Sequence, residues 1–128
     1  GGPGGWIILI EPEVMLGEDL LVPDLAGWKK ERLPTPPKEN WISVVPDWVC
    51  EVMSPGAFRT DRVRKMPIYA ANGVLYLWLI DPLNKLLEAF RMKDGVWVVM
   101  GNYLENDKAR IEPFQEAEID LANLWWGD

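Results

Sequence analysis

The sequence WVCEVMSP, residues 48–55, and the sequence RKMPIYAANGVLYLWLID, residues 64–81, decide the fold. The first is rich in Val and Trp and predicts a buried strand that ends near its Ser-Pro pair. A helix is expected over residues 60–72, where apolar residues recur at helical spacing. An interior proline costs a helix about 3 kcal/mol, so we expect regular helix to begin near residue 64, with Pro67 in its first turn. Val74–Ile80 then forms a second apolar strand.

The flanking segments predict further strands around this unit. Trp6–Ile10 is a short apolar run, and Leu20–Trp28 is another that only a Pro-Asp pair interrupts. Leu86–Met92 and Val96–Tyr103 flank an Asp-Gly pair, which is a strong hairpin signal. The end of the chain, Leu121–Trp126, is expected to form a short helix that docks by its tryptophans. Strands, one helix and a meander predict an α/β (α+β) fold, not a helical bundle, in a single domain of 128 residues.

The composition excludes several kinds of chemistry. The chain has no histidine, which excludes Ser-His-Asp and Cys-His catalysis and zinc held by histidine. Any chemistry must use carboxylates, lysines, hydroxyls or a metal bound by oxygen. The only cysteine, Cys50, cannot form an intrachain disulfide; this favours a reducing, cytoplasmic location, and its apolar surroundings indicate buried packing. No apolar stretch approaches the roughly 20 residues of a membrane span, so no membrane partner is expected.

Charge is distributed unevenly along the chain. The net charge of -7 disfavours a general nucleic-acid binder, which is usually basic. Four of the 13 basic residues nevertheless lie within seven positions, namely Arg59, Arg62, Arg64 and Lys65. This cluster is either a local phosphate-binding patch or the solvated face of a helix, and the sequence leaves both interpretations open.

Two carboxylates interrupt apolar runs and are the candidate metal ligands. Asp24 stands in LLVPDLAGW and Glu51 in WVCEVM. A buried carboxylate must be paired, metal-bound or neutralised, and one or two carboxylates are a usual ligand set for Mg²⁺ or Mn²⁺. Alternatives remain open: Asp24 follows a proline and could cap a turn, and Glu51 could form an internal ion pair with Lys65 or an arginine.

Lys65 is the third candidate because it begins the helix that follows the Glu51 strand. From there it could point back over the end of the strand, orient or deprotonate a water and offset charge on a phosphate. The alternative is a solvated lysine paired with Asp61 one helical turn earlier.

The residues resemble a known family at this point. VPDLAGW, then PDWVCEVMSP, then DRVRKMPIYAANGVLYLWLIDP look like the large bacterial Uma-type family of "putative restriction endonucleases", in the PD-(D/E)XK nuclease superfamily. The resemblance runs from about residue 4 to residue 126. It implies a mixed central sheet flanked by helices, and a divalent metal, Mg²⁺ or Mn²⁺, held by Asp24 and Glu51.

The resemblance also has departures. The superfamily usually places a lysine two residues after this glutamate, where Met53 stands here, so the lysine is displaced to Lys65. Relatives usually carry an N-terminal helical region before the opening GGPGG, and we expect residues 1–128 to be a single nuclease-like domain without it. Relatives with the EPE segment often have histidine at position 15, which is methionine here, and Glu13 is a further candidate metal ligand. Three other residues match family positions: Asp61 as a loop anchor, Tyr69 as packing and Asp81 as a turn residue.

Two functions follow from the sequence. The first is a metal-dependent endonuclease that hydrolyses DNA phosphodiester bonds, with Arg59, Arg62 and Arg64 positioning the DNA backbone. The second is a catalytically inactive module on the same fold, in which exposed strand edges and tryptophans, notably Trp125 and Trp126, mediate partner binding or a homodimer.

Overall fold

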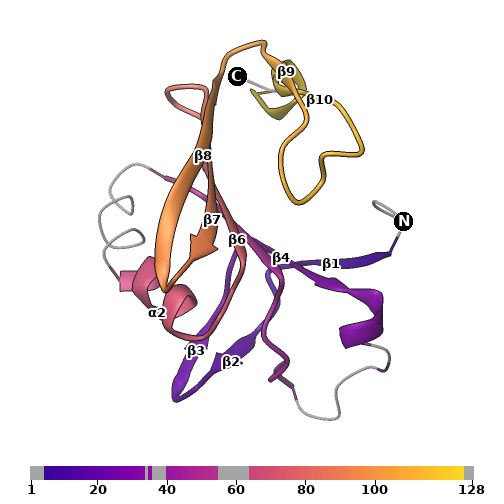
Figure 1. The fold of residues 1–128 in the computed structure, drawn as a ribbon, viewed down its shortest axis with the longest axis vertical. Helices are drawn as coiled ribbons and strands as arrows, with labels where there is room; N and C mark the ends of the chain where they lie inside the picture. The colour runs from indigo at the N-terminus through magenta and orange to yellow at the C-terminus, as the bar shows by residue number, and fades with distance from the viewer. Residues whose placement is uncertain (1–4, 34, 36–39, 55–63, 126–128) are drawn as a thin grey trace.

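A computed structural model describes residues 5–33, 35, 40–54 and 64–125. Its main feature is a six-stranded sheet in the order β1-β4-β5-β6-β7-β8 (Figure 1). The bounds of these strands are Trp6–Ile10 (β1), Leu25–Lys29 (β4), Trp48–Val52 (β5), Tyr76–Asp81 (β6), Leu86–Lys93 (β7) and Val96–Leu104 (β8). Two small hairpins complete the strands: β2, Val14–Leu16, with β3, Asp19–Leu21, and β9, Lys108–Ala109, with β10, Ile119–Asp120.

The sheet is mixed, as the family resemblance implies. β5 and β6 run parallel, whereas every other neighbouring pair in the sheet is antiparallel. A parallel pair needs a long crossover connection, and helix α2, Met66–Ala71, lies in the connection between β5 and β6. The two remaining described helices are short 3₁₀ turns, η1 at Lys30–Arg32 and η3 at Leu121–Trp125.

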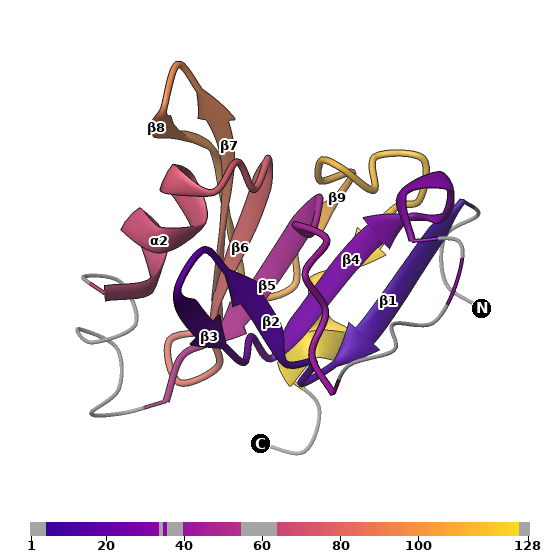
Figure 2. The same ribbon diagram turned by 90° about the horizontal axis from the view of Figure 1, so that it is seen from below.

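The two faces of the sheet have different covers. Side chains alternate along β5, so Val49 and Met53 belong to one apolar cluster while Trp48 and Cys50 belong to the other. The first cluster lies under α2 and the β2–β3 hairpin, and the second lies under the segment that leads to η3. Figure 2 shows α2 and β2–β3 in front of the sheet and the yellow C-terminal segment behind it. Glu51 therefore points toward α2.

Helix α2 begins two residues later than the sequence suggests. Regular helix starts at Met66, with Pro67 in its first turn, and Arg64 and Lys65 form a turn that leads into it. The helix ends before Gly73, whose φ of +83° glycine adopts without strain. None of the described helices is long and apolar enough to cross a membrane.

Two further segments clarify the predicted strands. The Asp94-Gly95 turn between β7 and β8 has positive φ at both residues, +53° and +78°, which confirms the predicted hairpin. The predicted apolar run Leu20–Trp28 is two strands rather than one, β3 and β4, with Pro23 in the gap between them. Proline has no N–H to donate to a sheet, which explains the break.

Candidate active site

Glu51 is buried in the centre of the sheet, near the end of β5. Only 2% of the residue is exposed, and its neighbours on this face are apolar. A buried carboxylate of this kind needs partners, and α2 with its leading turn supplies them. Lys65 Nζ lies 3.4 Å from Glu51 Oε2, and Tyr69 Oη donates a hydrogen bond of 2.6 Å to the same oxygen.

Asp24 is brought to Glu51 by the pairing of β4 with β5. The antiparallel register ends with Leu25 opposite Cys50. Asp24 directly precedes Leu25 and Glu51 directly follows Cys50, so both acids come next to this last pair. The Asp24 carboxylate is fixed there, because its Oδ2 accepts the Val52 N–H at 2.7 Å. Both acids therefore lie at the same end of β4 and β5.

Cys50 stands next to Glu51 on β5, and its side chain is fully buried. Burial raises the pKa of its thiol well above the usual range, and the charges of Glu51 and then Asp24 raise it further. Burial confirms that Cys50 is packing, and a protonated thiol is a poor metal ligand. The donors that this site offers are therefore carboxylate oxygens.

The donor set fits Mg²⁺ or Mn²⁺ in number and chemistry. The two carboxylates carry two negative charges and Lys65 carries one positive charge, so the three groups together have one net negative charge. Magnesium is usually held by one or two carboxylates and keeps several waters. In the part of the chain that the structure describes, no three acidic or cysteine side chains gather as a potential metal-binding group. Glu13 is exposed, and its part in a metal shell stays a prediction.

Tyr69 differs from its predicted role. The sequence suggests packing alone, and the ring is indeed buried in the first apolar cluster. Its hydroxyl nevertheless bonds directly to Glu51. The signal that could have found it is spacing, because Tyr69 stands four residues after Lys65 and such pairs share one helical face.

Asp81 behaves as the sequence predicts. It ends β6, and its two carboxylate oxygens accept the backbone and side-chain N–H groups of Asn84, at 3.1 and 2.8 Å. It is a turn residue before Pro82. Of the basic cluster, Arg64 is described and exposed, whereas Arg59 and Arg62 lie outside the described residues, as does Asp61.

Trp125 corrects a detail of the interaction-module hypothesis. It is buried in the second apolar cluster, and its Nε1 donates to the Glu105 carbonyl at 2.6 Å. This confirms docking by the C-terminal turn and removes Trp125 from any partner surface. Trp126 lies outside the described residues.

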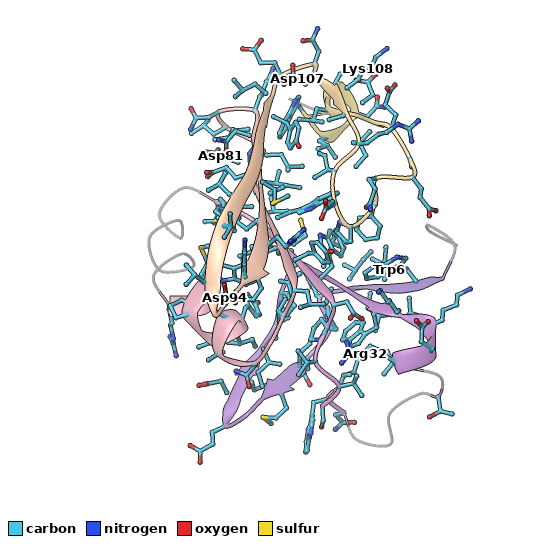
Figure 3. The ribbon with its side chains drawn as sticks, in the orientation of Figure 1. Trp6, Arg32, Asp81, Asp94, Asp107 and Lys108 are labelled. Carbon is cyan, nitrogen blue, oxygen red and sulfur yellow. The ribbon has the colours of Figure 1, made fainter. Side chains whose placement is uncertain are left out.

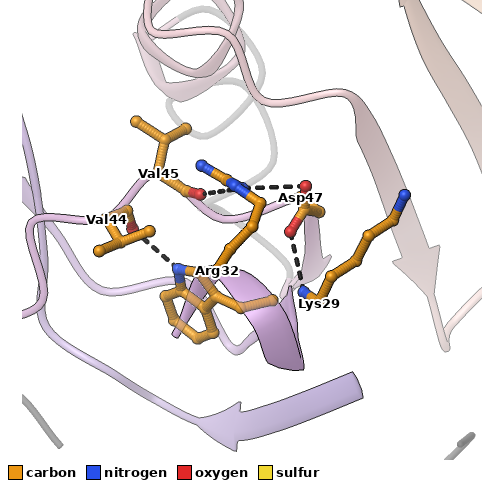
Figure 4. A network of polar contacts seen from close by, with 6 residues as sticks. Lys29, Arg32, Val44, Val45 and Asp47 are labelled. Atoms are coloured by element: carbon orange, nitrogen blue, oxygen red, sulfur yellow. Dashed lines mark hydrogen bonds and ion pairs between the residues drawn. The ribbon is translucent and has the colours of Figure 1, made fainter. Parts of the chain in front are cut away.

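A second buried acid, Asp47, was not singled out from the sequence. It lies just before β5, at the opposite end of that strand from Glu51. One oxygen lies 2.9 Å from Arg32 Nη1, and the other accepts the Lys29 N–H at 2.9 Å (Figure 4). Its sequence signal is a repeat, since Val-Pro-Asp precedes both β4 and β5. Asp47 is therefore a structural anchor of the loop, distinct from the Asp24–Glu51 site.

Comparisons with known proteins identify the family and a similar fold. The family model Uma2, described as "Putative restriction endonuclease", matches residues 3–122. Among solved structures, a "putative nuclease belonging to DUF820" from Anabaena variabilis ATCC 29413 superposes with a TM-score of 0.78 at 21% identity, over 94% of this chain and 68% of that one. No curated protein matches. At this identity the structural match concerns the fold alone. The family match, which covers nearly the whole chain, shows that the chain belongs to the Uma2 family.

Proposed function

We propose that this chain is a metal-dependent endonuclease that hydrolyses DNA phosphodiester bonds in the cytoplasm, with Mg²⁺ or Mn²⁺ held by Asp24 and Glu51. The observation that carries the proposal is the bond from the Val52 N–H to Asp24 Oδ2, which ties Asp24 to the strand that carries Glu51, with the Lys65 ammonium 3.4 Å from Glu51. Membership of a family described as putative restriction endonucleases supports the same reaction class.

Each side chain has a distinct part in this proposal. A divalent cation at such a site polarises a phosphate and activates a water. Asp24, held by the Val52 N–H, and Glu51, held from α2, present their oxygens from two adjacent strands. Lys65 offsets charge that develops on the phosphate and orients the attacking water. It takes the part that Met53 cannot play, because Met53 has no charge and is buried in the apolar cluster.

The proposed contact with DNA is local. Arg64 is exposed and stands next to Lys65, so it is suited to contact a phosphate beside the site. Arg59 and Arg62 are proposed to extend this contact from outside the described residues. Phosphate contacts of this kind position a backbone without reading its sequence. Contacts between these arginines and phosphates predict binding that weakens as salt is added, and the overall charge of -7 predicts that the binding is weak.

Nuclease assays with Mg²⁺ or Mn²⁺ test the proposal directly. Purified wild type, Asp24→Asn and Asp19→Asn are incubated with supercoiled and linear DNA, and nicking is followed on gels. Asp19 is an exposed aspartate on β3 and is the matched control. Wild type and Asp19→Asn should cut only with metal, and Asp24→Asn should lose at least about 100-fold in rate, the order that one strong electrostatic contact contributes. Equal cutting by wild type and Asp24→Asn would remove the proposed site.

A specific observation supports the second candidate, a catalytically inactive module that forms a homodimer. β8 is an edge of the sheet and has no charged residue in nine positions. Five of its apolar side chains are exposed, namely Val96, Val98, Val99, Met100 and Leu104. Long, apolar, uncharged edges are templates for pairing with another chain.

The ends of β8 bear on self-pairing with a second copy of this chain. Lys93 and Asp94 precede the strand and Glu105 follows it, so antiparallel self-pairing brings Glu105 near both a lysine and an aspartate at each end. Figure 3 labels Asp94 and Asp107 near the two ends of this long strand. A register shift near Ala89 and Phe90 bends the edge and restricts pairing to one half of it.

Sedimentation equilibrium tests the self-pairing. If the chain is an inactive module, we expect a concentration-dependent dimer. Val98→Lys should convert this dimer to monomer, because a lysine blocks pairing at the edge of a sheet. A wild-type monomer at all concentrations contradicts it. Mn²⁺ titration separates module from enzyme: absence of metal binding, with stability unchanged in Asp24→Asn, favours the inactive module.

A further inference from the structure

The short helix α2 and its leading turn provide two partners of the buried Glu51 carboxylate. Lys65 and Tyr69 are four residues apart, so one face of a helical turn carries both side chains. Both reach the same atom, Glu51 Oε2, at 3.4 and 2.6 Å. The strand lysine of the superfamily is thus replaced by two groups on a neighbouring helix.

We infer that Tyr69 is a positioning residue for the metal site: its hydroxyl sets the direction in which Glu51 presents its carboxylate to the cation. The inference rests on the proposed function, because it assigns a purpose to the geometry of one of the proposed ligands. Tyr69 itself contacts neither metal nor DNA in this proposal.

The geometry supports positioning beyond packing. The ring of Tyr69 is buried among apolar side chains, with 1% of the residue exposed, so its orientation is fixed by close packing. A hydrogen bond to a carboxylate is stronger and more directional than one between neutral groups. Two donors on Oε2, one of them on a fixed ring, restrict the rotation of the carboxylate and hence the direction of its other oxygen. An aliphatic residue in place of Tyr69 would fill the same space without this donor, and the side chain of Lys65 has more freedom than the packed ring.

Isothermal titration with Mn²⁺ alone tests this inference without relying on activity. Tyr69→Phe keeps the ring and removes only the hydroxyl. Tyr76→Phe is the matched control, since Tyr76 lies on β6 outside the contacts of Glu51 that the structure shows. Removing an outer group that orients a metal ligand typically weakens metal affinity 10–100-fold, and we expect a loss of about this size for Tyr69→Phe and none for Tyr76→Phe. Near-UV circular dichroism at 10 °C verifies that each variant is folded.

The outcomes separate this inference from the function on which it rests. Wild-type binding with unchanged or tighter affinity in Tyr69→Phe overturns the positioning role and leaves the metal site standing; tighter binding would mean that the hydroxyl competes with the cation. Absence of Mn²⁺ binding in wild type overturns both. If Tyr69→Phe does not fold, Lys65→Arg provides a second measurement: it keeps a cation at Glu51 with the hydroxyl in place, and the inference then requires affinity within about threefold of wild type. A loss as large as that expected for Tyr69→Phe would show that Lys65, not Tyr69, sets the carboxylate.

Discussion

Lys65→Met should reveal how much the ion pair with Glu51 contributes to stability. At 3.4 Å and an effective dielectric constant of about 20, the gross Coulomb attraction is about 5 kcal/mol. The lysine side chain is 23% exposed, and fixing it costs up to about 2 kcal/mol of rotamer entropy. The net loss in Lys65→Met is therefore about 3 kcal/mol, at the low end of the range for breaking a buried pair. Methionine keeps most of the aliphatic packing.

Urea unfolding in EDTA, followed by tryptophan fluorescence, measures this loss. Lys108→Met is the matched control, because Lys108 is exposed on β9, and its free energy of unfolding should change by less than about 0.5 kcal/mol. For Lys65→Met we expect an unchanged slope and a lower urea midpoint. In a thermal scan the same loss lowers the melting temperature by roughly 10 °C. A midpoint equal to that of the control would refute the reasoning, since the pair would then contribute nothing measurable.

Repeating the unfolding with Mn²⁺ distinguishes the two interpretations of Lys65. A cation at Asp24 and Glu51 takes over part of the charge compensation that the lysine supplied, and a bound ligand stabilises the folded state. The difference in the free energy of unfolding between wild type and Lys65→Met should therefore become smaller with Mn²⁺. A difference that stays constant would indicate a purely structural ion pair.

Three further outcomes are expected. Asp47→Asn should lower the free energy of unfolding by about 1–3 kcal/mol, because a buried acid loses its charge-assisted partner Arg32, while Mn²⁺ affinity by titration stays unchanged; a loss of affinity would connect Asp47 to the site. Cys50 should react with Ellman's reagent at pH 8 only after unfolding, since burial raises the pKa of its thiol. As the pH rises, the thiol loses its proton in the unfolded chain before it does so in the folded protein. The free energy of unfolding should therefore fall above about pH 8.5. Trp125→Ala should cost about 3 kcal/mol or more by thermal denaturation, and a smaller cost would mean that the C-terminal turn contributes little.

Sequence patterns predict individual elements of this fold well. The β7–β8 hairpin follows from an Asp-Gly pair between apolar runs, because both residues tolerate positive φ. The isolation of Glu51 in an apolar strand predicts its burial and its need for partners, and both are present. The Pro-Asp pair that interrupts Leu20–Trp28 lies where the run divides into β3 and β4, because proline has no N–H to donate to a sheet.

The partners of each acid are harder to predict. The local sequence around Asp24 is compatible with a turn residue and with a metal ligand. Only the bond that its carboxylate accepts from the Val52 N–H shows that Asp24 is tied to the strand that carries Glu51. Tyr69 looks like any apolar helix residue until its hydroxyl meets Glu51. Asp47 resembles Asp24 in local sequence, yet its partner is Arg32.

By itself, the sequence determines which segments are strands, where the helix can begin and which carboxylate needs a partner. The spacing of apolar residues, the position of a proline and the apolar neighbours of an acid are all properties of a short stretch of chain. The tertiary structure alone decides that β4 lies antiparallel beside β5 with Asp24 bonded to the Val52 N–H, and that α2 and its leading turn bring Tyr69 and Lys65 to one oxygen. The physical reason is that side-chain alternation tells which face a residue occupies but not which strand lies next to it. That choice comes from the packing of the whole sheet.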